Sequence, residues 1–252
     1  MPSPLPYMMK QLMDITGIIL AGGKNSRMGM PKAFLEINGT RLIDKILAIY
    51  RTICSEIIIV TNDPLAYTEF TDVVIVTDIY KGKGALGGIY SGLFYASHQY
   101  SFVAACDMPF LNKNFIIYLI SQAQQYDIIV PVLDDISYSK AETARCDDSN
   151  DEAKGMISPG SNKVEETIDK VYPPKPARFQ PLHAIYSKNC LIPIKRLINA
   201  DKLKITGFYK ESRLLQISGE KIKQYNQDGR LFLNINTPED LKQQQNNSLP
   251  NI

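Results

Sequence analysis

Apolar runs of four or five residues alternate, along the first half of the chain, with longer segments whose apolar residues recur every three or four positions. Short continuous apolar runs are typical of strands buried on both faces, and the longer spacing is typical of helices with one buried face. The predicted strands cover residues 17–20, 57–61, 73–77, 102–105 and 128–132. The predicted helices cover residues 40–54, 88–96 and 112–125.

The alternation of strands and helices predicts the fold class. Successive β-α-β units with fully apolar strands are typical of an α/β fold with three layers, in which helices cover a mostly parallel, Rossmann-like sheet. In such a sheet, ligands bind beyond the carboxyl ends of the strands, where the strand order reverses. Four polar or glycine-rich positions directly follow predicted strands and are expected to meet there: residues 21–32, Asn62, Asp78 and Asp107.

The pattern changes after residue 133. Residues 134–178 are rich in Ser, Asp, Glu and Lys, contain few large apolar residues and end near a proline-rich run, so we expect a flexible acidic insertion. The core of a single domain, spanning residues 1–252, then comprises residues 15–133 and 180–245. The insertion is either a lid or partner contact or a tolerated surface loop, and the loop is favoured.

The last part of the chain returns to the α/β pattern. We expect strands at residues 182–186 and 231–235, with a helix at residues 189–198 between them. The segment Thr237-Pro238-Glu239-Asp240 offers an N-cap threonine, a proline at the first helical position and an acid at the third. This order of residues predicts the start of a final helix.

Composition narrows the function classes. The chain has 252 residues, 44% of them hydrophobic, and a formal net charge of +2 without a strong basic stripe, so we expect no nucleic-acid partner. No apolar run approaches ~20 residues, so we expect no membrane span, and residues 1–13 read as an unstructured lead-in rather than a signal peptide. The four cysteines are dispersed, which favours a reducing, cytoplasmic location and argues against a zinc site.

One strand-to-loop junction carries the clearest chemistry. The sequence Leu20-Ala21-Gly22-Gly23 ends a buried strand and leads into a polar loop with Arg27 and Lys32. Glycines let backbone N–H groups approach an anion closely, and the two cations can neutralise phosphate charge. The loop spells neither the Walker A pattern nor the dinucleotide pattern, so it predicts a different way of binding a triphosphate.

The joint pattern resembles the nucleotidyltransferase superfamily, and within it the chain is most similar to the molybdenum cofactor guanylyltransferase family. The resemblance runs from residue 15 to about residue 133 and resumes from residue 180 to residue 241. The matching segments, in family order, are residues 20–32, 60–62, 78 with 84–89, 105–109, 180–184 and 234–241.

The resemblance implies roles for individual residues. It implies that Asp107 binds Mg²⁺ and contacts the nucleotide, and a carboxylate at a strand tip opposite a phosphate loop is chemically suited to that cation. Lys32 and Arg27 are expected to act on the phosphates as catalytic cations. The nucleotide-binding set is expected to comprise Leu20, Ala21, Gly22, Gly23, Lys32, Asn62, Asp78 and Asp107, with Asn234 and Asn236 in the pterin-side pocket.

Several of these residues also have ordinary structural interpretations. Asp107 can be a helix cap or turn residue, Asn62 lies in a sequence that is typical of turns, and the pair Asn234 and Asn236 can serve as edge-strand hydrogen-bonding groups. His183 either shapes the acceptor pocket or is structural. The residues alone leave these alternatives open.

The resemblance implies GMP transfer from GTP to the terminal phosphate of the molybdenum-molybdopterin cofactor, with Mg²⁺, and molybdoenzymes or chaperones as possible acceptors of the product. A phosphate nucleophile is already ionised near neutral pH, so no general base is required. Ala85 and Gly87 differ from the family's usual Pro-Leu-Ala-Gly. The alternatives are a CTP-dependent relative with the same acceptor, another NTP transferase, or a non-catalytic nucleotide- or cofactor-binding protein.

Overall fold

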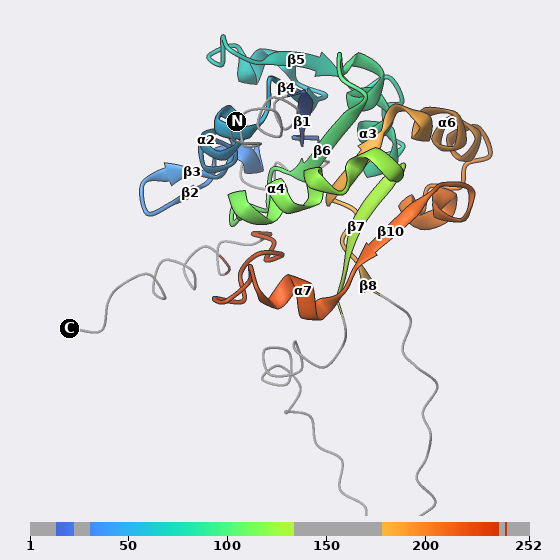
Figure 1. Cartoon of the computed structure of the whole chain (residues 1–252). Coiled ribbons are helices and arrows are strands. Elements are labelled where there is room, and N and C mark those ends of the chain that lie inside the picture. The colour runs from blue at the N-terminus through green and yellow to red at the C-terminus, as the bar shows by residue number, and fades with distance from the viewer. Residues whose placement is uncertain (1–13, 23–30, 134–177, 237–239, 241–252) are drawn as a thin grey trace, which may run out of the picture.

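The sheet organises the molecule. The computed structural model describes residues 14–22, 31–133, 178–236 and 240. Its main sheet has eight strands in the order β10-β7-β9-β6-β1-β4-β5, with β8 paired to β7 (Figure 1). All neighbouring pairs are parallel except those made by β8 and β9. The strands are β1 (Ile15–Leu20), β4 (Glu56–Thr61), β5 (Val74–Thr77), β6 (Tyr100–Ala105), β7 (Ile128–Leu133), β8 (Arg178–Phe179), β9 (His183–Ser187) and β10 (Leu214–Ile217).

Helices cover both faces of this sheet. On one face pack α2 (Leu42–Ile53), α4 (Lys113–Ser121) and α7 (Gly219–Lys223), and on the other pack α3 (Gly84–Tyr95) and α6 (Leu191–Asn199). The buried residues of α2 recur at helical spacing, which is why one stripe of this helix joins the core. The two hydrophobic clusters on opposite faces confirm the predicted three-layer, mostly parallel α/β fold.

Short elements complete the described chain. A small hairpin joins β2 (Glu36–Ile37) to β3 (Thr40–Arg41), and its turn residues Asn38 and Gly39 both have positive φ, as a tight hairpin turn requires. The short 3₁₀ helices are η1 (Lys32–Phe34), η2 (Pro64–Tyr67), η3 (Ala123–Gln125), η5 (Lys188–Cys190) and η6 (Ile205–Glu211).

The pattern-based elements are mostly confirmed, with three differences. The helix predicted at residues 88–96 begins four residues earlier, at Gly84. The strand at residues 73–77 was expected to be buried on both faces, but β5 is an edge strand and Val74 is 47% exposed. The predicted strand at residues 231–235 is wrong, because this segment is a turn followed by irregular chain that pairs with no strand of the sheet.

Other expectations fall on residues outside the described ones. The acidic insertion lies there from residue 134 to residue 177, whereas Arg178, its predicted last residue, belongs to β8. Residues 237–239 also lie outside, although Asp240 is helical and its carboxylate accepts a hydrogen bond from the backbone N–H of Asn236.

A buried carboxylate joins the last strands of the sheet. Asp127, just before β7, accepts hydrogen bonds from Nε and Nη2 of Arg213, each 3.0 Å long, and from the side chains of Asn189 and Ser187. The Arg213 guanidinium holds the pKa of Asp127 well below its usual range. This network fixes β10 and η5 against β7, and thereby fixes the half of the sheet that follows the insertion.

Candidate active site

The strand registers bring the predicted site segments to one edge of the sheet. Leu20 at the end of β1 lies beside Val60 and Ala105, and Thr61 lies beside Thr77. The loops that follow β1, β4, β5 and β6 therefore leave the sheet at the same edge. The strand order reverses between β1 and β6, because β4 and β5 lie on one side of β1 and β6 lies on the other.

Three residues from distant parts of the chain meet at this reversal. Nζ of Lys32 lies 3.9 Å from Oδ2 of Asp107 and donates a 2.9 Å hydrogen bond to Oδ1 of Asn236. The backbone N–H of Ile235 donates to the carbonyl of Asp107, so the segment that carries Asn236 is held against the end of β6. Lys32, Asp107 and Asn236 form what we call the strand-end triad.

Asp107 is the candidate metal ligand. Its side chain is 21% exposed; burial raises the pKa of this carboxyl, and the Lys32 ammonium opposes the rise. Among the described residues, no three His, Cys, Asp or Glu side chains gather as a complete metal cage. Mg²⁺ typically takes one or two carboxylates together with waters and substrate phosphates, so a single accessible carboxylate fits this cation.

The glycine junction, which is the end of β1 with Ala21 and Gly22 after it, lies beside the end of β4. The N–H of Ala21 donates to the carbonyl of Val60 over 2.9 Å, and a Cβ built on Gly22 would stand 3.7 Å from Nδ2 of Asn62. Gly22 and Asn62 are both exposed, so a ligand at this edge can reach them. The structure thus brings Leu20, Ala21, Gly22 and Asn62 together, whereas Gly23 and Arg27 lie outside the described residues.

Asp78 is placed at the end of β5 and is buried. Its N–H donates to the carbonyl of Thr61, and its Oδ1 accepts hydrogen bonds from the N–H of Tyr80 and from Oγ of Ser91. Sequence reasoning missed Ser91. The available signal was a hydroxyl in the middle of the apolar helix α3, where every residue from Leu86 to Leu93 is buried.

The G-x-G-x-x-G spelling at residues 82–87 does not form a loop throughout. This spelling is typical of a nucleotide-binding loop, but its second half is the first turn of α3, which begins at Gly84. Lys83, at the N-cap position, donates from Nζ to Asp201 over 2.8 Å. The glycines allow close packing: a Cβ built on Gly88 would lie 3.2 Å from the side chain of Leu20.

The two asparagines expected in the pterin-side pocket lie on irregular chain. Asn234 and Asn236 are exposed on either side of the buried Ile235, so they keep the alternation of a strand without pairing as one. The edge-strand interpretation is therefore wrong. Asn236 contacts Lys32 in the strand-end triad.

His183 lies inside the core. It is fully buried among the rings of Phe102, Phe115 and Phe232, with ring centroids 5.0 to 5.7 Å away. Burial lowers the pKa of His183 to about 3. Of the two interpretations left open by the sequence, burial favours the structural one, because the buried ring has no surface with which to contact an acceptor.

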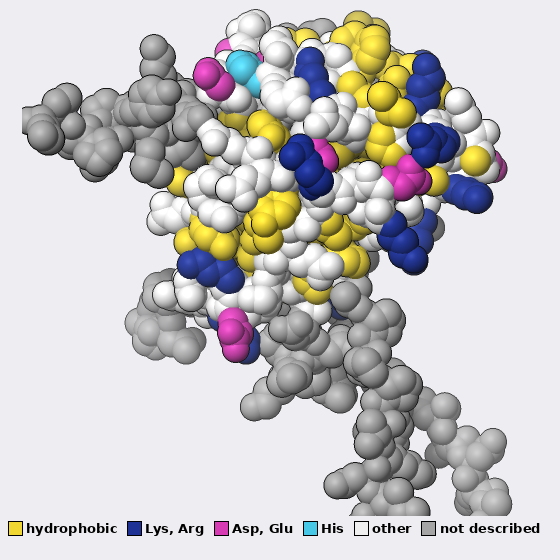
Figure 2. Space-filling view, turned by 45° about the vertical axis from the view of Figure 1, so that its right-hand side comes forward, with side chains coloured by type: hydrophobic (Ala, Val, Ile, Leu, Met, Phe, Trp, Pro, Cys, Tyr) yellow, Lys and Arg dark blue, Asp and Glu magenta, His cyan; other side chains and the backbone are white. Residues whose placement is uncertain are grey.

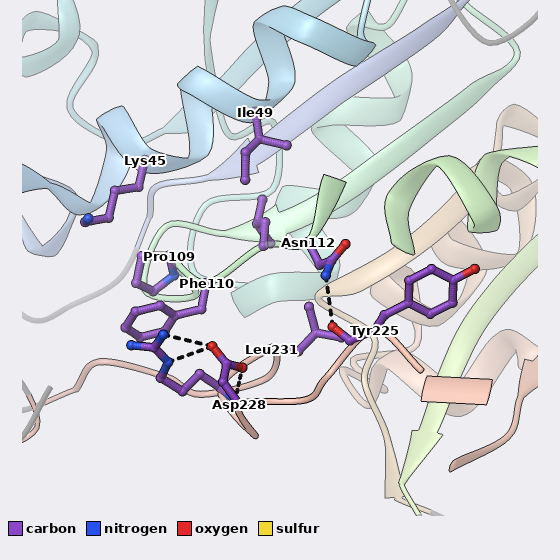
Figure 3. Close-up of a pocket in the computed structure, with 10 residues that line it drawn as sticks. Lys45, Ile49, Pro109, Phe110, Asn112, Tyr225, Asp228 and Leu231 are labelled. Atoms are coloured by element: carbon purple, nitrogen blue, oxygen red, sulfur yellow. Dashed lines mark hydrogen bonds and ion pairs between the residues drawn. The ribbon is translucent and has the colours of Figure 1, made fainter. Parts of the chain in front are cut away.

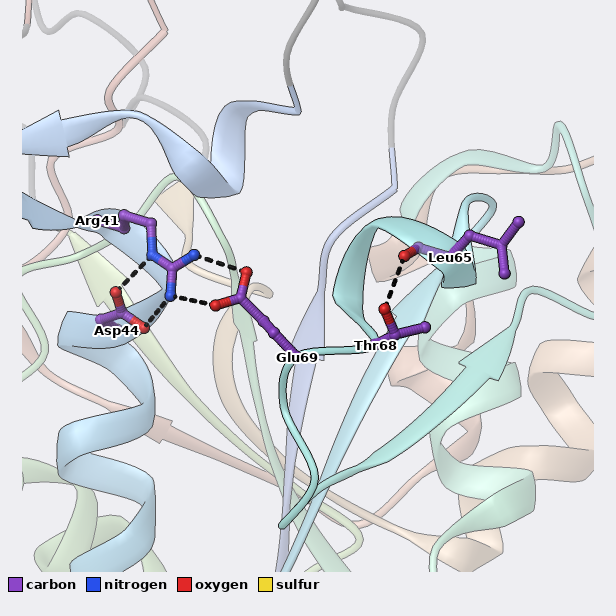
Figure 4. Close-up of polar contacts among 5 residues, drawn as sticks. All are labelled: Arg41, Asp44, Leu65, Thr68 and Glu69. Atoms are coloured by element: carbon purple, nitrogen blue, oxygen red, sulfur yellow. Dashed lines mark hydrogen bonds and ion pairs between the residues drawn. The ribbon is translucent and has the colours of Figure 1, made fainter.

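The guanidinium of Arg41 joins two separate segments of the chain (Figure 4). Arg41, just before α2, donates to both carboxylate oxygens of Glu69 and of Asp44, and its guanidinium lies 5.4 and 5.3 Å from the ring centroids of Phe34 and Phe70. It thereby ties the hairpin that follows η1 to the loop that follows η2.

We expect Arg41→Lys to lower the unfolding temperature by a few degrees, because a lysine cannot bind two carboxylates through a planar fork. Thermal unfolding followed by circular dichroism measures this. The matched control is Arg51→Lys, because Arg51 donates two hydrogen bonds to one exposed carboxylate, Asp72, and lies over no aromatic ring among the described residues. An equal decrease in both variants would contradict the joining role of Arg41.

A separate open cavity of about 360 Å³ lies on the α2 and α4 side (Figure 3). Its lining includes Lys45, Pro109 and Phe110, and Arg230 there pairs with Asp228 and packs on the Phe110 ring. No member of the strand-end triad lines this cavity. The candidate site is therefore defined by the strand ends and not by this cavity.

The described residues on one face of the molecule carry side chains of mixed character. Figure 2 shows Lys and Arg side chains interspersed with Asp, Glu and apolar side chains on one face of the molecule. In the described ranges, no helix is long and apolar enough to cross a membrane.

The fold and the site together indicate the class of protein to which the chain belongs. A mostly parallel sheet that places a glycine junction, a lysine and a metal-competent carboxylate at its reversal point is typical of α/β enzymes that bind nucleotides. The chain belongs to the MobA-like NTP transferase family, whose domain matches residues 17–216, and it is therefore a nucleotidyltransferase. Members of this family generally use a divalent metal ion.

Individual relatives agree with this assignment. The molybdenum cofactor guanylyltransferase of Desulfosudis oleivorans is 31% identical over 229 residues, covering 90% of this chain and 93% of the relative. A probable molybdenum cofactor guanylyltransferase of Clostridium perfringens strain SM101 is 34% identical, covering 87% and 90%.

Solved structures show the same fold. Molybdopterin-guanine dinucleotide biosynthesis protein A from Archaeoglobus fulgidus superposes with a TM-score of 0.65 at 22% identity, covering 92% of this chain and 97% of that one. The 2-C-methyl-D-erythritol 4-phosphate cytidylyltransferase from Thermus thermophilus gives 0.61 at 18% identity, covering 93% and 98%.

Proposed function

We propose that this chain transfers GMP from GTP to the terminal phosphate of the molybdenum-molybdopterin cofactor, releasing pyrophosphate and forming the guanine dinucleotide cofactor. The observation that supports this most is the strand-end triad, which places a cation and a carboxylate 3.9 Å apart beside the Gly22 junction. The names of the relatives supply the acceptor and the nucleotide.

The proposed reaction does not require a general base. The acceptor phosphate is ionised near neutral pH and attacks the α-phosphate of GTP, so the barrier lies in bringing two polyanions together and in stabilising the leaving pyrophosphate. Positioned cations and backbone N–H groups meet that need by electrostatics.

Each residue then has a defined task. Lys32 contacts the phosphates, and the N–H groups of the Gly22-Gly23 junction approach them closely, with Arg27 as a second cation of the same loop. Asp107 would hold Mg²⁺, which when bound withdraws charge from the phosphates. Asn236 orients the Lys32 ammonium through their 2.9 Å hydrogen bond.

The base and the acceptor are assigned to other residues. Asn62, beside Gly22, offers an amide that can both donate to and accept from a base edge, and Asp78 contacts the nucleotide from the end of β5. Asn234 and Asn236 face the pterin side. The CTP-dependent reaction on the same acceptor is the alternative, because Ala85 and Gly87 differ from the family's usual sequence at the start of α3.

Thermal-shift titration with GTP, CTP and ATP, each with Mg²⁺, tests the nucleotide. We expect GTP to raise the unfolding temperature most, since a ligand that binds the folded state at 100 times its Kd stabilises by about 2.7 kcal/mol. A clear preference for CTP would contradict guanylyl transfer, and no binding of any NTP would favour a non-catalytic protein. Pyrophosphate release with purified acceptor then tests the reaction itself.

Three further expectations remain proposals. We infer a cytoplasmic location from the dispersed cysteines, of which Cys54, Cys106 and Cys190 are free in the described part of the chain. We also propose that residues 1–252 form one domain. Molybdoenzymes or their chaperones are the proposed recipients of the labile product.

A further inference from the structure

The first turns of α3 form a cradle for the carboxylate of Asp78. Oγ of Ser91 lies 2.8 Å from Oδ1 of Asp78 and 2.9 Å from the carbonyl of Gly87, and it accepts a 2.9 Å hydrogen bond from the N–H of Ile79. The N–H of Tyr80 also donates to Oδ1 over 3.0 Å. Ser91 is fully buried, so these contacts fix the rotamer of its hydroxyl and of the carboxylate.

Gly87 completes the cradle by having no side chain. A Cβ built there would stand 2.9 Å from the carbonyl oxygen of Tyr80, and 3.2 and 3.3 Å from the two carboxylate oxygens of Asp78. Either the backbone at Tyr80 or the carboxylate would have to move. The glycine at this position therefore lets Asp78 lie directly against the helix.

The two carboxylate oxygens of Asp78 differ in their hydrogen bonding. Oδ1 accepts from both Tyr80 and Ser91, whereas in the described part of the chain no donor reaches Oδ2. The backbone of Asp78 is tied to Thr61, and the next glycine of α3, Gly88, packs on Leu20 at the end of β1. The carboxylate of Asp78 thus lies at the edge at which the nucleotide is proposed to bind.

We propose that Ser91 is a positioning residue that turns Oδ2 of Asp78 toward the nucleotide, where this single oxygen accepts one hydrogen bond from a ribose hydroxyl. The inference rests on the proposed function. The guanine edge presents two neighbouring N–H donors, which a carboxylate meets best with both oxygens side by side. Because Oδ1 is already occupied by Tyr80 and Ser91, a single hydroxyl donor is the better match.

The test compares Ser91→Ala with the wild-type chain for binding of GTP, 2′-deoxyGTP, 3′-deoxyGTP and inosine triphosphate, each with Mg²⁺. We expect Ser91→Ala to weaken the binding of GTP and of inosine triphosphate by about tenfold, which corresponds to the loss of one hydrogen bond of about 1.4 kcal/mol. For the deoxynucleotide that lacks the contacted hydroxyl, wild type and variant should bind alike. Ser101→Ala is the matched control, because this serine is also fully buried and its Oγ has no partner among the described residues.

The possible outcomes distinguish a failure of the proposed function from a failure of the ribose assignment. If the wild-type chain binds no GTP, the proposed function fails before the variants are compared. If it binds GTP and Ser91→Ala weakens all four nucleotides equally, or none, the ribose assignment is wrong. Should Ser91→Ala not fold, Gly87→Ala displaces the same carboxylate from the other side, and the same dependence on the ribose hydroxyl is expected.

Discussion

Asp107→Ala is expected to lower turnover with GTP and Mg²⁺ by ~10²-fold or more, the scale of one lost electrostatic contact in a preorganised site. Asp107 is the carboxylate of the strand-end triad and faces the Lys32 ammonium at 3.9 Å. Its loss removes the proposed ligand of the metal at the point where negative charge accumulates. Pyrophosphate release measured over a range of Mg²⁺ concentrations checks the prediction.

Stability measurements keep this result interpretable. A partly exposed ion pair 3.9 Å long contributes little to folding, so the unfolding temperature of Asp107→Ala should stay close to that of the wild type. Asp72→Ala is the control, because this carboxylate pairs with Arg51 on the surface and away from the strand-end triad. Near-wild-type, Mg²⁺-dependent turnover of Asp107→Ala would refute the metal assignment.

The strand ends were predictable because their signals are local. An apolar run followed by Gly22, Asn62, Asp78 or Asp107 needs only the periodicity of the chain to be located, and parallel β-α-β topology then brings such positions to one edge. The registers of β1 with β4 and β6 confirm that they meet. Nothing local, however, predicts that Lys32 reaches Asn236, since 204 positions separate them.

The errors have physical causes. Residues 231–235 have the apolar content of a strand because Leu231, Phe232 and Ile235 fill the core beside the exposed Asn234, and irregular chain can do this as well as a strand. The start of α3 was placed too late because Gly84 and Gly87 read as loop residues, although Gly87 packs closely against Tyr80 and Asp78 within the helix. The strand β10 was not predicted, because Gln216 interrupts its apolar residues and most of the strand is incompletely buried.

The core histidine makes acid stability the second large effect. Burial lowers the pKa of His183 to about 3, whereas the unfolded chain has an ordinary histidine pKa of about 6.5. Between pH 6.5 and pH 3, His183 is mostly protonated in the unfolded chain and mostly neutral in the folded chain. Folding stability therefore falls as the pH decreases from 6.5 toward 3, and at pH 4.5 this one group costs about 2 to 3 kcal/mol.

We expect His183→Leu to abolish that loss, because leucine has a similar volume and does not titrate. Urea unfolding at pH 7 and pH 4.5 measures the difference: the wild type should lose about 2 to 3 kcal/mol more than the variant over this interval. In the control His98→Gln, His183 is retained and the steep loss should persist. Neither ring nitrogen of His183 has a partner among the described residues, so the variant should be at least as stable as the wild type at pH 7. Parallel pH profiles for His183→Leu and the wild type would show that His183 takes up its proton without unfolding, and that a water or a movement of the surrounding rings admits the charge.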